Sequence, residues 1–287
     1  MTQPLEAEVV AALDQFGLHA RSWQCLSTIR TAKYERRVYR LDLKGGRMLK
    51  ARRLENEATA RRLFEIRQGA PAGFAPVLHC HGAVLLEAWI EGEDLAQRPA
   101  TTRHLIEAAT LLACLHATPL VFGRPLPATQ STAAEREMAE QARGRLAADG
   151  RLPLAESDGI GAALKQLDPK QALLGLVHTD FCGENMVIDP DGRLHIIDNE
   201  RMGLGALGLD VARTWYRWTL PLPAWECFCA NYQARMPHED ALRHFAFWAL
   251  VATLKSAVLL LRLDPARAHV PVERLRQIMA EFVQVER

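Results

Sequence analysis

The densest group of chemically useful side chains lies in the second half of the sequence. His178, Asp180 and Asn185 occur in the segment HTDFCGEN, which has the form H-x-D-x-x-x-x-N. A turn at residues 189–192, with the sequence DPDG, separates this segment from Asp198. Phosphoryl transfer needs a carboxylate that faces the acceptor hydroxyl and oxygen ligands that hold magnesium on the phosphates. A loop followed by a hairpin can present these oxygen-bearing groups on one wall of a cleft.

These residues resemble the catalytic segment of the aminoglycoside phosphotransferases and of the choline, homoserine and fructosamine kinases. The resemblance implies an α+β, protein-kinase-like fold and a catalytic set made of Asp180, His178, Asn185 and Asp198. Asp180 would be the catalytic base, Asn185 and Asp198 the magnesium ligands, and His178 a brace for the loop. Glu200 would face the acceptor. The implied cofactors are ATP and Mg²⁺.

The elements that must position these groups begin with a small sheet and the helices near it. Residues 38–50 hold two short runs of strand-forming residues around the turn Gly45-Gly46, which predicts an antiparallel hairpin. Residues 55–67 contain no Gly or Pro and are rich in helix formers. The expected elements are, in order, a helix at 5–16, strands at 38–43 and 47–50, a helix at 55–67, and strands at 77–78 and 84–86.

Within this part of the chain, the resemblance implies a nucleotide site. Lys50 follows the hairpin turn, where the kinase fold carries a strand lysine that contacts the ATP phosphates. Glu57 on the next helix, in preference to Glu55, would pair with this lysine. The segment VLLEAWIEG resembles an interlobe hinge, in which the Ala88 carbonyl and the Ile90 amide would receive adenine.

The loop between the first two strands departs from the resemblance. A loop that cradles phosphates is commonly rich in glycine, yet residues 29–35 contain none. Thr31 and Lys33 are therefore the expected phosphate contacts in this loop. The missing glycines leave open an alternative, a nucleotide-binding pseudokinase with a regulatory role. The joint presence of the three catalytic oxygen-bearing residues favours an active enzyme.

The rest of the chain has mainly helical patterns. Residues 102–116 place leucine and alanine along one helical face, and residues 186–197 predict a hairpin as an exception to the helical trend. Asp210 would cap a helix or hold amides of the catalytic loop. We therefore expect a β-rich, nucleotide-binding N-lobe at residues 1–90, and a mostly helical C-lobe at residues 91–287 with the catalytic loop and the acceptor site.

Composition limits the partners and the compartment. The chain has 287 residues, of which 49% are hydrophobic and 24% charged, and a formal net charge of +1. Such a balance gives no nucleic-acid footprint. The six cysteines form no CxxC pair, and the first residues do not resemble a signal peptide, so we expect a cytoplasmic protein. The apolar stretch 245–263 contains Lys255, which predicts a buried helix and no membrane partner.

The acceptor is a small-molecule hydroxyl whose class the sequence leaves open. Sites for aminoglycosides tend to be acidic because the ligand is polycationic. The acids in the expected acceptor region are Glu200, Glu226, Glu239 and Asp240. They are too few to decide between an aminoglycoside, a sugar and an amino alcohol.

Overall fold

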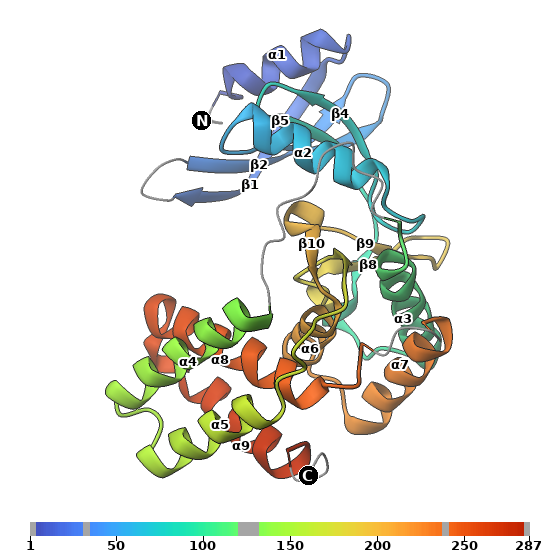
Figure 1. Cartoon of the computed structure of the whole chain (residues 1–287). Helices are drawn as coiled ribbons and strands as arrows, with labels where there is room; N and C mark the ends of the chain where they lie inside the picture. The colour runs from blue at the N-terminus through green and yellow to red at the C-terminus, as the bar shows by residue number, and fades with distance from the viewer. Residues whose placement is uncertain (1–3, 31–34, 120–131, 237–240, 284–287) are drawn as a thin grey trace. The chain divides into compact units, whose positions relative to one another are not determined.

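The computed structural model describes residues 4–30, 35–119, 132–236 and 241–283 (Figure 1). The chain divides into two compact units. The first unit contains residues 1–99 and 184–203, and the second contains residues 100–183 and 204–287. The first unit is therefore built from two separate segments of the sequence.

A five-stranded antiparallel sheet forms most of the first unit. Its strand order is β1-β2-β3-β5-β4. The strands are β1 (Ala20–Arg30), β2 (Glu35–Leu43), β3 (Met48–Arg53), β4 (Val77–His81) and β5 (Val84–Ala88). The turn between β2 and β3 uses Gly45 and Gly46 at φ of 95° and 83°, which glycine adopts without steric cost. Because β3 pairs with β5, Lys50 lies opposite Glu87 in the ladder.

Two helices pack in the first unit, α1 (Ala7–Gln15) and α2 (Glu57–Gln68). The buried face of α1 joins a core cluster that includes Leu41 and Leu49 of the sheet. The helix α2 packs against β4 and β5. It begins after Asn56, whose side chain accepts a hydrogen bond from the Thr59 amide at 2.8 Å and so satisfies one free donor of the helix end.

A second, smaller sheet completes the first unit. It contains β6 (Glu93–Asp94), β8 (Met186–Ile188) and β9 (Leu194–Ile196), in the order β6-β8-β9. Gly92 makes the approach of β6 to β8 possible. Its φ is 152°, and a Cβ atom at this position would lie 2.1 Å from the Ile188 carbonyl oxygen. The chain that follows β5 is therefore held against the hairpin that the sequence predicts.

Helices make up most of the second unit. They are α3 (Thr102–His116), α4 (Thr132–Ala148), α5 (Leu154–Gln166), α6 (Leu207–Arg217), α7 (Leu222–Arg235), α8 (Phe245–Leu263) and α9 (His269–Glu281). A short strand, β7 (Leu174–Val177), pairs with β10 (Gly203–Ala206). Single 3₁₀ turns occur along the whole chain at Leu95–Gln97, Gly183–Asn185, Asn199–Arg201 and Pro265–Arg267.

The helix α8 forms the core of the second unit. Among the described residues, it is the one helix that is long and apolar enough to cross a membrane, but 56% of its most apolar window is buried. It packs against α4, α6 and α9. Around its first residue, Phe245, the rings of Trp215 and Phe282 lie 5.7 and 5.1 Å away, centroid to centroid. This packing agrees with the buried helix predicted from the sequence.

The arrangement of the elements confirms the predicted α+β fold class. The antiparallel sheet is N-terminal, and most of the helices follow it in the chain. The two predicted hairpins form as β2–β3 and β8–β9.

The substitution Gly92→Ala should destabilise the protein by more than about 3 kcal/mol, because the new Cβ meets a carbonyl oxygen and the backbone conformation excludes L side chains. Gly82→Ala is the matched control. Gly82 has a φ of 52°, and a Cβ added there meets no heavy atom within 4 Å, so the cost should be about 1 kcal/mol. Urea unfolding followed by circular dichroism measures both. Equal losses of unfolding free energy in the two variants would contradict the close approach of β6 to β8 at Gly92.

Candidate active site

Lys50 lies on β3 and points away from the apolar core. Its neighbours Leu49 and Ala51 are buried in that core, and side chains alternate between the faces of a strand. The Nζ atom of Lys50 lies 3.3 Å from Oδ1 of Asp198. Burial lowers the pKa of Lys50, and the Asp198 carboxylate opposes this effect. The charge of Lys50 is therefore supported by its partner.

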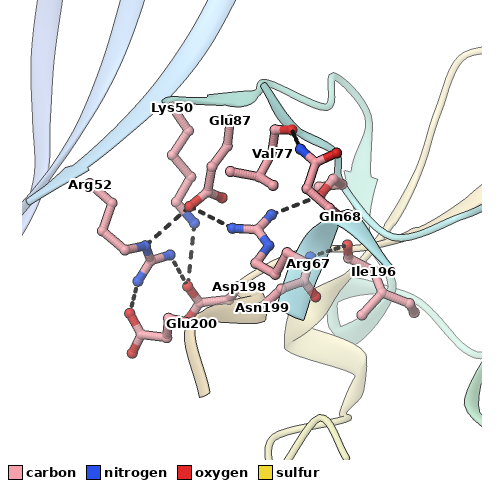
Figure 2. A network of polar contacts seen from close by, with 11 residues as sticks. Lys50, Arg52, Arg67, Gln68, Val77, Glu87, Ile196, Asp198, Asn199 and Glu200 are labelled. Carbon is pink, nitrogen blue, oxygen red and sulfur yellow. Dashed lines mark hydrogen bonds and ion pairs between the residues drawn. The ribbon is translucent and has the colours of Figure 1, made fainter. Parts of the chain in front are cut away.

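Arg52 lies two residues further along β3, so it faces the same side as Lys50. Its side chain is 1% exposed and lies at the centre of a buried ion network (Figure 2). Its Nε lies 3.4 Å from Oε1 of Glu87, and its Nη2 lies 2.5 Å from Oδ1 of Asp198. Its Nη1 pairs with Glu200. A buried guanidinium needs such ionised partners, because desolvation without them is costly.

Glu87 lies on β5, next to Arg52. Its Oε1 lies 2.9 Å from Nη1 of Arg67, which comes from the last turn of α2. Burial by itself raises the pKa of Glu87, but Arg67, Arg52 and Lys50 outweigh burial and bring the pKa to about 2. The carboxylate is therefore ionised at neutral pH and pairs with both guanidinium groups.

Asp198 follows β9 and has a left-handed backbone, with a φ of 58° that is uncommon for a residue other than glycine. Burial by itself raises its pKa, but Arg52 and Lys50 hold the pKa of Asp198 well below its usual range. Its side chain is 38% exposed. The carboxylate is thus ionised, fixed by two cations, and still accessible to a ligand.

Two residues with side-chain oxygens lie next to the strands of the hairpin β8–β9. Asn185 immediately precedes β8 and Asp198 follows β9 two residues after its end. The Ile197 amide donates a hydrogen bond to the Asn185 carbonyl oxygen at 2.8 Å, which closes the open end of the hairpin. A carboxylate and an amide oxygen are hard donors of the kind that Mg²⁺ prefers. The donor set therefore fits a magnesium ion.

The predicted pairing of Glu57 with Lys50 is wrong. Glu57 is the first residue of α2, and its side chain is 60% exposed. Its Oε1 lies 2.9 Å from Nη2 of Arg61, one turn later on the same helix. A residue in the first turn of α2 faces solvent here, whereas the last turn carries Arg67 inward to Glu87. The residue that α2 contributes to the ion network around Arg52 is therefore a cation, Arg67.

A pocket of about 360 Å³ lies within the first unit. Lys50, Ala88 and Ile90, three of the residues predicted to bind nucleotide, line it together with apolar side chains such as Val187. The Ala88 amide donates to the Pro76 carbonyl at 2.9 Å, so this amide is already used. The volume is within the range typical of small-molecule sites.

In the second unit, Asp210 holds the loop that carries the predicted base. Its two carboxylate oxygens accept hydrogen bonds from the amides of His178 and Thr179 at 2.8 and 2.7 Å. Thr179 has a φ of 68°, so the loop has a tight, left-handed bend at this residue. Burial by itself raises the pKa of Asp210, but His116 and the loop amides bring it below its usual value. Of the two roles expected for Asp210, to cap a helix or to hold loop amides, these hydrogen bonds show the second.

Asp180 is positioned by this loop and faces a cation. Its amide donates to Nδ1 of His178 at 3.3 Å, and His178 is fully buried. Oδ1 of Asp180 lies 3.0 Å from Nη1 of Arg217, at the end of α6. The two side chains are 20% and 36% exposed. The second guanidinium nitrogen of Arg217 lies 3.8 Å from the Cys182 sulfur.

Two of the four acids of the expected acceptor region, Glu200 and Glu226, lie among the described residues. Glu200 is 9% exposed and pairs with Arg52, so it does not serve as an open acceptor contact. Glu226 is exposed on α7. Glu239 and Asp240 lie outside the described residues.

Sequence reasoning missed four charged residues of the two sites, Arg52, Arg67, Glu87 and Arg217. A signal existed for Glu87, because it follows three apolar residues in a strand that is buried on both faces. Arg52 is the second of two charged residues that share a face of β3. Thr31 and Lys33, the predicted phosphate contacts, lie outside the described residues.

The depressed pKa of Glu87 makes stability depend on pH. Because the pKa is about 2 in the folded chain and 4.5 ordinarily, the Glu87 contribution is fully present above pH 4.5 and is lost as the pH falls toward 2. Its size is on the order of 3 kcal/mol. The gap in unfolding free energy between the wild type and Glu87→Gln should therefore narrow below about pH 4.5.

Urea unfolding at several pH values measures this gap. Glu93→Gln is the control, because the Glu93 side chain is 75% exposed and forms only a surface pair with Arg98. A gap for Glu87→Gln that stays constant from about pH 6 to about pH 3 would disprove the assignment.

Comparisons with known proteins bear on the family and the fold of the chain. The sequence model of the phosphotransferase enzyme family, APH, matches residues 28–248. A search of curated protein sequences found no significant match.

Solved structures of several phosphotransferases share the fold. Choline kinase LicA from Streptococcus pneumoniae has a TM-score of 0.63 and 14% identity, over 96% of this chain and 98% of that one. Macrolide 2'-phosphotransferase MphH from Brachybacterium faecium has a TM-score of 0.63 and 14% identity, over 95% and 97%. A thermostable mutant of aminoglycoside phosphotransferase APH(4)-Ia, in a ternary complex with AMP-PNP and hygromycin B, has a TM-score of 0.63 and 18% identity, over 95% and 97%.

These structural likenesses confirm the kinase-like fold that the resemblance implies. The family match extends over more than half of the sequence and includes both Lys50 and the segment HTDFCGEN. The chain therefore belongs to the phosphotransferase enzyme family, APH.

Proposed function

We propose that this protein transfers the γ-phosphoryl group of ATP to a hydroxyl of a small molecule, with Mg²⁺ as cofactor. Membership of the family supports phosphotransferase chemistry on a small molecule. The observation that carries the proposal is the ion pair between Lys50 and Asp198 at 3.3 Å, in the unit whose pocket Lys50 also lines. Phosphoryl transfer needs such a lysine for the phosphates and such a carboxylate for the metal.

In this proposal, the nucleotide occupies the pocket of the first unit. Adenine lies along the segment after β5, with the Ala88 carbonyl and the Ile90 amide as its partners. Lys50 holds the phosphates by charge. Mg²⁺, when bound, neutralises the phosphate oxygens, and Asn185 and Asp198 would hold it. One structural relative was solved with AMP-PNP, which supports nucleotide use.

Asp180 orients the acceptor hydroxyl and accepts its proton in this proposal. Phosphoryl transfer depends mainly on positioning and charge neutralisation, so the backbone around Asp180 must be rigid. The hydrogen bonds from the loop amides to the buried Asp210 carboxylate support this requirement. The bond between the Asp180 amide and His178 adds a second restraint.

Arg217 bears on the class of the acceptor. Its guanidinium lies 3.0 Å from the Asp180 carboxylate, so a cationic group of an acceptor would meet a like charge there. Among the described residues, the expected acceptor region adds only Glu226 as an exposed acid. Sugars and other neutral alcohols are therefore favoured over a polycationic aminoglycoside, and an amino alcohol is intermediate.

An active enzyme fits these contacts better than a regulatory pseudokinase. The Asp198 carboxylate is ionised and its side chain is 38% exposed, as a ligand of the metal in phosphoryl transfer must be, whereas nucleotide recognition alone needs no such ligand. We also propose a cytoplasmic location. All six cysteines are free, as a reducing compartment predicts.

Incubation of the protein with ATP, Mg²⁺ and a panel of sugars, amino alcohols and aminoglycosides should release ADP with at least one acceptor. Release should stop when a chelator removes Mg²⁺, because the metal neutralises the phosphates. A coupled spectrophotometric assay measures ADP, and mass spectrometry identifies the phosphorylated product. Saturable nucleotide binding without acceptor-dependent ADP release across the panel would favour the regulator instead.

Asp180→Asn should lower kcat by about 10²- to 10⁴-fold on the acceptor found in this way, because the amide cannot accept the hydroxyl proton. The unfolding free energy should change little, since both Asp180 and its partner Arg217 are partly exposed. Asp191→Asn is the control, because it removes an exposed carboxylate from the β8–β9 turn. A normal kcat for Asp180→Asn would rule out the role proposed for Asp180.

A further inference from the structure

The ion network of Figure 2 is balanced in charge. Each of its cations lies within ion-pair distance of at least one carboxylate. The cations are Lys50, Arg52 and Arg67, and the carboxylates are Glu87, Asp198 and Glu200. The formal charges of these six side chains sum to zero without any further ion.

Arg52 differs from the other two cations in the number of carboxylates that it contacts. Lys50 pairs with Asp198, and Arg67 pairs with Glu87. Arg52 contacts all three carboxylates, and it is the partner of Glu200 in the network. Removal of its charge would leave an excess of one negative charge close to Asp198.

This balance affects any cation that binds at Asp198. A divalent ion there approaches two positive groups, the Arg52 guanidinium at 2.5 Å and the Lys50 ammonium at 3.3 Å from the same carboxylate oxygen. Like charges at such distances repel strongly in a partly buried site. Nucleotide phosphates bring several negative charges and so offset this repulsion.

We infer that Arg52 is a positioning residue that sets the charge of the metal site, so that a divalent cation binds there together with nucleotide phosphates and only weakly alone. The inference rests on the proposed function, in which Asp198 is a ligand of Mg²⁺. Arg52 holds the Asp198 carboxylate and at the same time opposes a metal ion that arrives without phosphate.

Mn²⁺ binding to the full chain without nucleotide tests the inference, with electron paramagnetic resonance as the readout of free Mn²⁺. The wild type should bind Mn²⁺ weakly alone and at least about tenfold more tightly when AMP-PNP is present. Arg52→Met should bind Mn²⁺ alone at least about tenfold more tightly than the wild type. Arg52→Lys, which keeps the charge, should resemble the wild type.

Arg61→Met is the matched control for net charge. It removes one positive charge from the same unit, but the Arg61 side chain is 68% exposed and pairs with Glu57 outside the network. Its Mn²⁺ affinity should equal that of the wild type. If Arg61→Met increased the Mn²⁺ affinity as much as Arg52→Met does, the inference would be overturned.

If Arg52→Met alone does not fold, a second pair of variants tests the inference. The pair is Glu200→Gln and the double variant Arg52→Met/Glu200→Gln. The double variant removes both members of one buried pair, which proteins tolerate better than loss of one member. Its network again sums to zero, whereas that of Glu200→Gln has one excess positive charge. The double variant should therefore bind Mn²⁺ alone at least about tenfold more tightly than Glu200→Gln.

Two results would overturn the inference. In the first, the wild type binds Mn²⁺ equally tightly with and without AMP-PNP. In the second, variants that lack the Arg52 charge bind Mn²⁺ alone with the same affinity as the matched variants that keep it. Neither result depends on turnover. A failure of the acceptor panel would therefore test the proposed function, while the Mn²⁺ titrations test the role of Arg52.

Discussion

The buried guanidinium of Arg52 makes ion pairs with three carboxylates, and the geometry of the candidate nucleotide site depends on them. Glu87 comes from β5, whereas Asp198 and Glu200 follow β9. A cation that is 1% exposed is stable only when ionised partners compensate for its lost hydration. The same pairs hold Asp198 in a backbone conformation that an aspartate seldom adopts. In this unit, the same ion pairs therefore compensate for the buried charge of Arg52 and fix the position of a candidate metal ligand, Asp198.

Local patterns in the sequence were sufficient for the elements that carry the site. The turn Gly45-Gly46 and the segment DPDG at 189–192 both predict hairpins, because their residues suit tight turns. Both hairpins form, and they carry Lys50 and Asp198. The distance of 3.3 Å between these two side chains joins positions 148 residues apart. Only the resemblance to a family related these positions, because no local pattern relates residues so far apart.

The charged residues of α2 show where sequence reasoning ends. Glu57 and Arg67 both belong to a helix that the pattern predicts, but the pattern does not say which charged side chain faces inward. The spacing of Ala60, Leu63 and Arg67 follows the helical repeat, so Arg67 continues the buried face. A long polar side chain on an apolar face is the signal that was available. Its partner Glu87 could not be inferred from α2, because the pair depends on how the helix packs on β5.

The composition of the first unit from residues 1–99 and 184–203 has a consequence for biosynthesis. During synthesis, the five-stranded sheet leaves the ribosome long before the β8–β9 hairpin that completes its unit. Until residue 203 has been made, Arg52 and Lys50 lack the carboxylates of Asp198 and Glu200. An N-terminal fragment of 99 residues would therefore carry buried cations in excess of their counter-charges. Translation must pass Glu200 before this unit can reach its final electrostatic balance.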